Sequence, residues 1–253
     1  MSQSILVSGA NGFIAAHAIE RLLARGDHVI GTVRDARNKD KNGFLTAMPG
    51  AAERLQLVDA DLNAADPFSA FVDVDAVLHM ASPYVMDAKN VQRDLVDPAV
   101  NGTLSMLRAA AKSHRVRRVV LTSSMAAVTD EPDGRLLTES DWNDKSSMTR
   151  NPYYFSKTAA ERAAWDFMAQ EKPQFDLVVI NPFLVIGPAH TSAINTSNQI
   201  LVDLLAGKYP AIMDLTWGFV DVRDVADAHL AAVNHTAAQG RYLCAASSMS
   251  MLI

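Results

Sequence analysis

A phenol and an ammonium lie four residues apart near the middle of the chain, in Tyr153-Tyr-Phe-Ser-Lys157. On a helix this spacing places both side chains on one face, one turn apart. A free phenol titrates at about 10, and a neighbouring ammonium lowers that value by stabilising the phenolate. Tyr153 is therefore a candidate proton donor for carbonyl reduction, tuned by Lys157. Taken singly, the two residues are equally typical of a half-buried core tyrosine and a solvated helix lysine.

Two hydroxyls, Ser123 and Ser124, follow the apolar run Arg118–Thr122. In open α/β sheets, ligands bind at the carboxyl ends of the strands. A serine beside the phenol would orient the substrate oxygen and stabilise its developing negative charge. Either serine suits this role, and we assign it to Ser124, which is nearer to the loop. Turn formation is the structural alternative.

A glycine-rich turn opens the chain, in Gly9-Ala-Asn-Gly12-Phe-Ile-Ala15, between the apolar run Ile5–Ser8 and the helical pattern Phe13–Arg25. A helix N-terminus favours a pyrophosphate, so a turn in this context predicts a dinucleotide site. Gly9 permits the tight turn and Gly12 the approach of backbone to phosphate. Ala15 stands where the strict fingerprint has a third glycine.

The residue after the second predicted strand, His28–Val33, is Arg34. A guanidinium can bind a 2′-phosphate bidentately, whereas an NAD-preferring site usually has a carboxylate at this strand end. We therefore expect NADP(H), with Asp35 keeping NAD as the alternative. Further cations follow at Arg37, Lys39 and Lys41, and a solvated basic loop is their structural alternative.

Short β-branched runs alternate with helical patterns along the first 180 residues. Strands are expected at Ile5–Ser8, His28–Val33, Arg54–Val58, Ala76–His79, Arg118–Thr122 and Leu177–Ile180. Helices are expected at Phe13–Arg25, near Pro67–Phe71, at Gln92–His114 and at Tyr153–Gln170. Strands this continuously apolar are buried on both faces, which predicts an α/β fold with a Rossmann-type doubly wound parallel sheet.

The pattern changes after Ile180, so we expect a dinucleotide-binding domain over residues 1–180 and substrate-lobe segments over 181–253. The lobe is small and C-terminal, and its segments are interleaved with a late return to the sheet. The expected order is a loop at Ala189–Asn198, a helix at Gln199–Ala206, a turn at Lys208–Met213, a helix at Val225–Asn234 and a strand at Arg241–Ala246.

Composition excludes several classes of protein. With 49% hydrophobic and 20% charged residues and a net charge of −5, nothing favours nucleic acid or an anionic membrane as a partner. The single cysteine, Cys244, excludes an internal disulfide and fits a reducing compartment. No apolar run is long enough to cross a membrane, and the first strand leaves no room for a signal peptide. We expect a cytoplasmic protein.

Two other kinds of site are not expected. A Gly-x-Ser-x-Gly elbow is absent, which argues against a serine hydrolase. The seven histidines show no metal-ligand spacing with each other or with Cys244, so no metal site is expected. His79, at the end of a predicted strand, is interpreted as a packed core residue.

With these residues in place, the chain resembles the extended short-chain dehydrogenase/reductase family. Within it, the chain is similar to the branch of dihydroflavonol reductases, cinnamoyl-CoA reductases and microbial NADPH-dependent aldehyde or ketone reductases. The motifs are Ser8-Gly-Ala-Asn-Gly-Phe-Ile-Ala15, Thr32-Val-Arg34-Asp35, His79-Met-Ala-Ser-Pro83, Asn101-Gly-Thr103, Thr122-Ser-Ser124, Tyr153 with Lys157, Asn181-Pro-Phe183 with Gly187-Pro188, and Phe219-Val-Asp-Val-Arg-Asp-Val-Ala226.

The resemblance implies that Ser124, Tyr153 and Lys157 form a catalytic triad and that Arg34 and Lys41 bind the 2′-phosphate. Asn101 matches a position in the active-site hydrogen-bond network, with helix packing as the alternative. Tyr153 and Lys157 are also cofactor contacts, and the others are expected at Gly9, Asn11, Gly12, Phe13, Ile14, Asp61, Leu62, Ala81, Ser82, Pro182 and Phe183. Asp61 could instead cap the segment that follows it. Homodimers through the helices at 92–114 and 153–170 are common in the family.

Two departures from the family pattern affect these expectations. Cinnamoyl-CoA reductases carry Asn-Trp-Tyr-Cys-Tyr at the catalytic tyrosine, whereas this chain has Arg150-Asn-Pro-Tyr-Tyr-Phe155, which argues against a CoA thioester substrate. Members usually continue well past Ile253 with helices that close the substrate lobe. Every cofactor motif lies upstream, so cofactor binding is expected regardless, while substrate closure depends on that region.

We therefore expect an NADPH-dependent reductase of a small apolar or aromatic aldehyde or ketone. Candidate pocket walls are Tyr84, Met86, Met125, Trp217 and Phe219, with a place in the core as the equal alternative for each. One alternative is a nucleotide-sugar epimerase or dehydratase of the same family, which would favour NAD. The other is a regulator that binds NADP without turnover.

Overall fold

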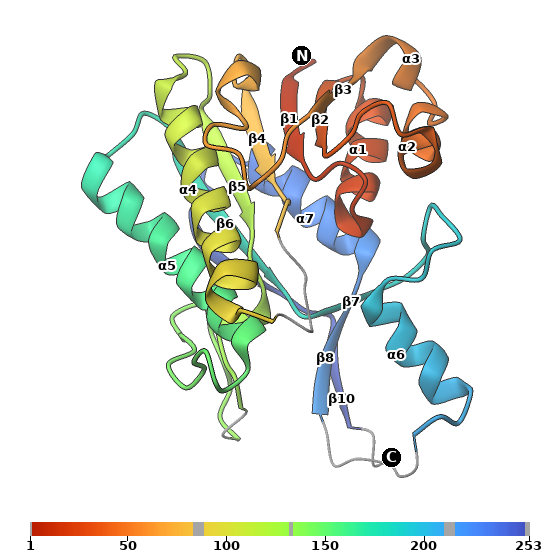
Figure 1. Ribbon diagram of the computed structural model, residues 1–253, viewed down its shortest axis with the longest axis vertical. Coiled ribbons are helices and arrows are strands. Elements are labelled where there is room, and N and C mark those ends of the chain that lie inside the picture. The colour runs from red at the N-terminus through yellow and green to blue at the C-terminus, as the bar shows by residue number, and fades with distance from the viewer. Residues whose placement is uncertain (1, 83–88, 132–133, 210–215, 251–253) are drawn as a thin grey trace.

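A parallel seven-stranded sheet forms the centre of the molecule in the computed structural model (Figure 1), with strand order β3-β2-β1-β4-β5-β6-β9. The structure describes residues 2–82, 89–131, 134–209 and 216–250. The strands are β1 (Ser4–Ser8), β2 (His28–Val33), β3 (Leu55–Asp59), β4 (Ala76–His79), β5 (Arg118–Thr122), β6 (Asp176–Pro182) and β9 (Gly240–Cys244). The direction of winding reverses between β1 and β4, and the crevice at such a point is where this kind of sheet binds ligands.

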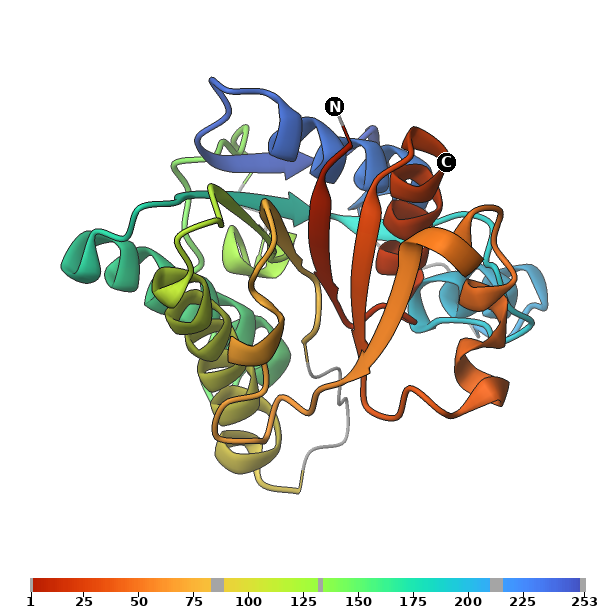
Figure 2. The same cartoon turned by 90° about the horizontal axis from the view of Figure 1, so that it is seen from above.

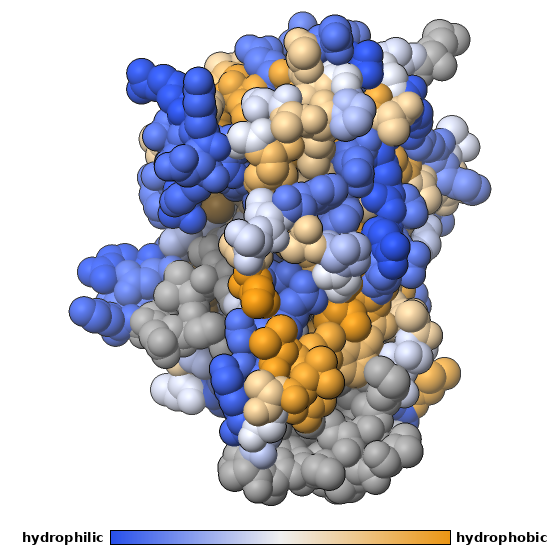
Figure 3. Space-filling view, turned by 90° about the vertical axis from the view of Figure 1, so that its right-hand side faces the viewer, coloured by the Kyte–Doolittle hydropathy of each residue, from blue (hydrophilic) through white to orange (hydrophobic). Residues whose placement is uncertain are grey.

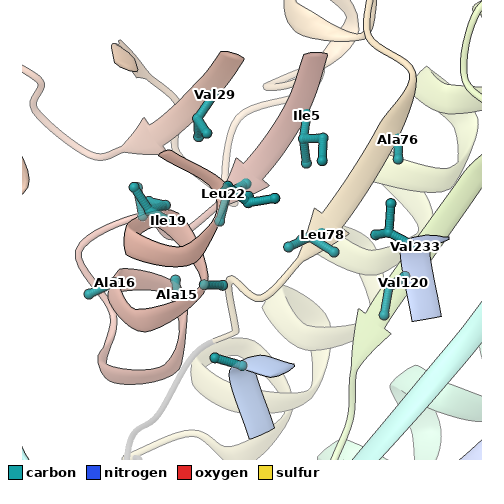
Figure 4. Close-up of a cluster of buried hydrophobic side chains, with 14 of the residues drawn as sticks. Ile5, Ala15, Ala16, Ile19, Leu22, Val29, Ala76, Leu78, Val120 and Val233 are labelled. Atoms are coloured by element: carbon teal, nitrogen blue, oxygen red, sulfur yellow. The ribbon is translucent and has the colours of Figure 1, made fainter. Parts of the chain in front are cut away.

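Helices cover both faces of the sheet, as Figure 2 shows from above. The helices α1 (Phe13–Arg25) and α7 (Val222–Asn234) lie together on one face, and α4 (Asp97–Lys112) and α5 (Pro152–Glu171) on the other. In the α1 layer, Ile19 and Leu22 pack towards Ile5 and Leu78 of the sheet (Figure 4). The predicted Rossmann-type α/β fold is confirmed.

A three-stranded sheet lies beyond the carboxyl ends of the main strands. It consists of β7 (Leu184–Ile186), β8 (Thr216–Asp221) and β10 (Ser247–Ser250), in the order β10-β8-β7. The helix α6 (Thr196–Leu205) stands beside it. Figure 3 shows apolar surface over the region of α6. The exposed apolar side chains on and next to this helix are Ile194, Val202, Leu204 and Leu205.

Several elements differ from the sequence prediction. Instead of one helix over 92–114, a π-helical segment, Gln92–Val96, precedes α4. The helices α2 (Lys39–Thr46) and α3 (Ala51–Arg54) and the whole small sheet were not predicted. The helix α6 begins three residues early because the Asn195 side chain caps it by accepting from the N–H of Asn198.

The late return to the sheet is present, because β9 pairs with β6. The helix α7 and the strand β9 come from the part of the chain after residue 180, yet both belong to the layers of the main sheet. The expected domain boundary at residue 180 therefore stays a prediction. Positions 210–213 of the expected turn lie outside the described residues. Among the helices of the described part, none has the length and apolar character needed to cross a membrane.

Candidate active site

The turn between β1 and α1 has the shape of a phosphate cradle. Gly9 has φ +68°, and a Cβ atom there would lie 3.0 Å from Cα of Ala81, so only glycine lets the end of β4 come this close. A Cβ on Gly12 would lie 3.1 Å from the carbonyl oxygen of Gly9. The first turn of α1 holds no acidic residue and receives no side-chain cap. Its open N–H groups therefore suit the pyrophosphate of a dinucleotide.

The hydroxyl of Ser8 fixes the end of β4. It accepts hydrogen bonds from the N–H groups of Met80 and Ala81, each 2.9 Å long, and lies 2.8 Å from Nδ1 of His79. Burial lowers the pKa of His79 to about 3, so its ring is neutral. Because Oγ of Ser8 already accepts from two N–H groups, its hydroxyl donates a hydrogen bond to Nδ1 of His79. The structure thus supports the interpretation of His79 as a packed residue.

The residues expected at the 2′-phosphate are exposed at one end of the crevice. Arg34 follows β2 directly and makes no ion pair within the described residues, and Lys41 lies in the first turn of α2. Asp35 uses its carboxylate to accept from the N–H of Arg37, 3.0 Å away. Asn11, in the glycine-rich turn, donates to Asn42 of α2 over 3.0 Å, which ties the two regions together. A guanidinium without an ion pair, next to a carboxylate that already accepts a backbone hydrogen bond, favours NADP over NAD.

Three other expected residues do not line the cavity described next, and their place in the site stays a prediction. One Asp61 oxygen accepts from the backbone and side-chain nitrogens of Asn63, which is the capping alternative considered from sequence. Leu62 packs on α4, where a Cβ on Gly102 would lie 2.8 Å from its Cδ2. Asn101 is exposed on α4. The structure assigns none of the three to the cavity described next.

A cavity of about 310 Å³ opens at the carboxyl ends of β1, β5 and β6. Residues that the sequence analysis selected make up half of its lining: Gly9, Gly12, Phe13, Ile14, Ser124, Tyr153, Lys157, Pro182 and Phe183. Ser123, the sequence-based alternative to Ser124, lines it as well. Sequence reasoning did not place the remainder there: Ala15, Met80, Thr122, Val185, Asn195, Thr196 and Ser197. The cradle for phosphate and the Tyr/Lys pair therefore border one space.

The helix α5 presents Tyr153 and, one turn later, Lys157 to this cavity. Nζ of Lys157 lies 5.7 Å from the centre of the Tyr153 ring and donates to Oγ of Ser82 over 2.8 Å. Burial lowers the pKa of Lys157 to about 8, while the negative charge of Glu161 acts in the opposite direction. Lys157 is therefore still mostly protonated at neutral pH and loses its charge at a lower pH than a solvated lysine.

The two serines after β5 have different partners. Oγ of Ser123 donates to Oε2 of Glu161 over 2.5 Å, deep in the protein. Oγ of Ser124 accepts from the N–H of Ala126, 3.2 Å away, and borders the cavity. Ser123 is therefore engaged with a carboxylate, and the hydroxyl proton of Ser124 is the one available to a ligand.

A buried hydrogen-bond network supports this end of the sheet. Asn181, fully buried near the end of β6, donates to Oε2 of Glu161 over 2.7 Å and to the carbonyl of Ser124 over 3.1 Å. Nε of Arg241 on β9 donates to Oε1 of Glu161 over 2.6 Å. The sequence analysis missed Glu161, although its position one turn after Lys157 on the same helix face was visible.

The expected pocket walls are only partly placed. Neither Met125 nor Phe219 lines the cavity. Tyr84, Met86 and the side chain of Trp217 lie outside the described residues. Phe183 does line it and packs on Gly218, where a Cβ would lie 2.4 Å from the Phe183 ring. Only a glycine at 218 leaves room for that ring.

Comparison with known proteins agrees with this geometry. The family model described as "NAD dependent epimerase/dehydratase family" matches residues 5–245. The chain belongs to this family. It is 40% identical over 248 residues to cinnamoyl-CoA reductase CAD2 of Medicago truncatula, covering 94% of this chain and 74% of that protein. It is 38% identical over 257 residues to tetraketide alpha-pyrone reductase 1 of Arabidopsis thaliana, covering 98% of this chain and 77% of that protein.

Among solved structures, the chain resembles yeast methylglyoxal/isovaleraldehyde reductase Gre2 complexed with NADPH. The TM-score is 0.88 at 34% identity, covering 98% of this chain and 79% of that one. These relatives are reductases, in agreement with the family branch identified from the sequence motifs.

Proposed function

We propose that this protein reduces an aldehyde or ketone to an alcohol with NADPH, and that Tyr153 donates the proton. One observation carries the proposal: the glycine-rich turn and the Tyr153–Lys157 pair border the same cavity. The relatives are named as reductases, and the yeast structure is an NADPH complex. The chain is an NADP-dependent oxidoreductase acting on carbonyl groups.

The residues present fit the cofactor, because a Cβ at Gly9 or Gly12 would fill the phosphate cradle. In this proposal, residues 9–14 bind the pyrophosphate, Arg34 and Lys41 bind the 2′-phosphate, and Ala81 and Ser82 lie along the ribose groups. Pro182 and Phe183 border the nicotinamide. When bound, NADPH supplies the hydride.

The protein's own groups handle the substrate oxygen. Ser124 donates a hydrogen bond to that oxygen, which stabilises its developing negative charge. Tyr153 then gives it the phenolic proton. The ammonium of Lys157, anchored on Ser82 at 2.8 Å, stabilises the phenolate that remains. Proton donation by Tyr153 therefore depends on the charge of Lys157.

The lining of the cavity indicates the chemical class of the substrate. Met80, Phe183 and Val185 supply apolar wall, while Asn195, Thr196 and Ser197 supply polar groups. Such a lining suits a small apolar or aromatic carbonyl compound better than a CoA thioester.

Two further features belong to the proposal. The single cysteine supports a cytoplasmic location. The family pattern supports a homodimer through α4 and α5. Light scattering coupled to size-exclusion chromatography tests the dimer, and a monomer at micromolar concentration would contradict it.

The function is tested by following NADPH and NADH absorbance against a panel of aldehydes and ketones. Tyr153→Phe is expected to lower kcat by about 10²–10⁴-fold, with a much smaller change in the Kd for NADPH. Tyr154→Phe, one position along the same helix, is the matched control and should keep its activity. NADPH binding without turnover of any carbonyl would instead indicate a sensor, and retained NAD with sugar-nucleotide turnover an epimerase.

A further inference from the structure

Three side chains outside the cavity converge between α1 and the loop that follows β7. They are His17, Glu20 and His190, and their potential ligand atoms all lie within 4.8 Å of one another. Oε2 of Glu20 lies 3.9 Å from Nδ1 of His17 and 3.6 Å from Nε2 of His190. We propose that this cluster binds a divalent transition-metal ion, with Zn²⁺ as the ion that the ligand set suits best.

The first observation concerns His17, which is only 4% exposed. Its Nε2 lies 2.9 Å from the carbonyl oxygen of Pro188. A carbonyl can only accept, so Nε2 carries the ring proton and Nδ1 holds a lone pair. A ring N–H donated to a backbone carbonyl is the arrangement that fixes the tautomer of metal-binding histidines.

The second observation is a pair of unsatisfied atoms. Nδ1 of His17 and Nε2 of His190 are both buried, and within the described residues neither has a hydrogen-bond partner. Leaving a buried polar atom unpaired costs about 1–3 kcal/mol. The two rings lie 4.2 Å apart, and Phe44 stacks on His190 with ring centres separated by 6.2 Å. A cation in front of both nitrogens would satisfy the lone pair of His17 and, with the His190 ring proton on Nδ1, that of His190.

The ligand set and spacing indicate the kind of ion. Two imidazoles and one carboxylate, with a fourth position left to water, match open zinc sites. Tetrahedral ligands about 2.0–2.1 Å from zinc lie about 3.3 Å from one another. The separations of 3.6 and 3.9 Å are close to this value, and all the ligand atoms lie within 4.8 Å of one another, so rotations of the three side chains would bring them to one ion.

The nearest positive charge is already paired. Arg21 lies 3.9 Å from Oε2 of Glu20 but is hydrogen-bonded to Asp227 on α7. Glu20 is thus open to a second cation. The sequence analysis expected no metal site because His17 and His190 are far apart in the chain, and only the fold brings them together.

A bound ion would fasten the loop after β7 to α1. That loop leads into α6, whose first residues Thr196 and Ser197 line the cavity. The ion would therefore hold the polar wall of the cavity against the cofactor-binding layer. This is a stabilising and positioning role, separate from the proton transfer assigned to Tyr153.

The test is a Co²⁺ titration of the chelator-treated full chain, read by the visible absorption of four-coordinate cobalt, with Zn²⁺ as competitor. We expect one Co²⁺ per chain, displaced by one Zn²⁺, and a higher Tm with Zn²⁺. Glu20→Gln and His190→Ala should weaken binding by more than the roughly 10–100-fold that loss of an outer-shell partner costs. The exposed His114 provides the matched control, His114→Ala, which should bind as the parent does.

The proposal is overturned by any of three results. These results are the absence of the visible bands, their retention in both ligand variants, and an equal loss of binding in His114→Ala. A Tm that responds to Glu20→Gln but not to Zn²⁺ would also overturn it, since the cluster would then be only an ion pair.

Discussion

The carboxylate of Glu161 accepts a 2.6 Å hydrogen bond from the guanidinium of Arg241, with 0% and 7% of the two side chains exposed. The same carboxylate accepts from Ser123 and Asn181. Arg241 also donates to the carbonyls of Glu139 and Asp141 and lies 3.8 Å above the ring of Trp142. The last strand of the main sheet is thereby linked to the helix that carries Tyr153 and Lys157.

Removing the cation from this pair should be costly. Arg241→Met leaves the Glu161 carboxylate buried without its counter-charge, and breaking a buried pair in this way costs about 3–5 kcal/mol. The free energy of unfolding from urea denaturation measures the loss. Arg162→Met is the matched control, because Arg162 also stacks on Trp142, at 4.9 Å, but is exposed. Its loss should stay within about 1 kcal/mol, and equal losses in the two variants would contradict the assignment.

The reduction should slow at alkaline pH. Lys157 has a pKa of about 8, so its ammonium is present below that pH and lost above it. We expect kcat/KM to fall as pH rises through about 8, approaching about tenfold per pH unit, because kcat/KM reports groups of the free enzyme. Stopped-flow measurement of NADPH oxidation across this range gives the profile.

The position of that fall should depend on Glu161. Its negative charge raises the pKa of Lys157 against the effect of burial. Glu161→Gln keeps the shape of the side chain and removes the charge, so the fall should move to lower pH. A profile at the same pH in a folded variant would show that Glu161 does not act on Lys157.

A comparison of Gly9 with Gly26 distinguishes two effects of an added Cβ atom: strain in a left-handed backbone, and a clash with a neighbouring residue. Gly9 and Gly26 both have positive φ, +68° and +89°, but a Cβ on Gly26 has nothing within 4 Å, whereas one on Gly9 meets Ala81. Each alanine variant should lose about 1–2 kcal/mol from the left-handed backbone. Only Gly9→Ala should also lose NADPH affinity, which isothermal titration calorimetry measures. Similar Kd values in the two variants would argue against the cradle.

Arg34 should discriminate between the two nicotinamide cofactors. Its charge-assisted hydrogen bonds to a 2′-phosphate are each worth about 1.5–3 kcal/mol. Arg34→Ala should therefore raise the KM for NADPH by roughly 10–100-fold and leave that for NADH nearly unchanged. Arg37→Ala, three residues further on and also exposed, is the control. Equal KM increases for both cofactors would contradict a contact with the 2′-phosphate.

Local patterns in the sequence predicted most of the main sheet. The strands at 28–33, 76–79 and 118–122 and the helix Phe13–Arg25 have the expected bounds, because continuous apolar runs and a helix-ending glycine are local signals. The family, the NADP cofactor and the class of reaction were also predicted, and the comparisons confirm them.

What could not be predicted depends on contacts between distant residues. The partner of Glu161 lies on β9, and the partner of His17 lies in the loop after β7. The difference between Ser123 and Ser124 likewise follows from Glu161, which only the folded chain places beside one of them. The strands of the small sheet were missed because each pairs with a strand that is distant in the sequence.

The link between Glu161 and Arg241 also sets an order of events during synthesis. The two residues are 80 positions apart, so at about 5–20 residues per second a ribosome needs about 4–16 s to travel between them. A nascent chain in that interval already has its Tyr/Lys helix but no cation for the buried carboxylate. The buried carboxylate beside Lys157 therefore gains its counter-charge late in translation, when β9 emerges and joins the sheet.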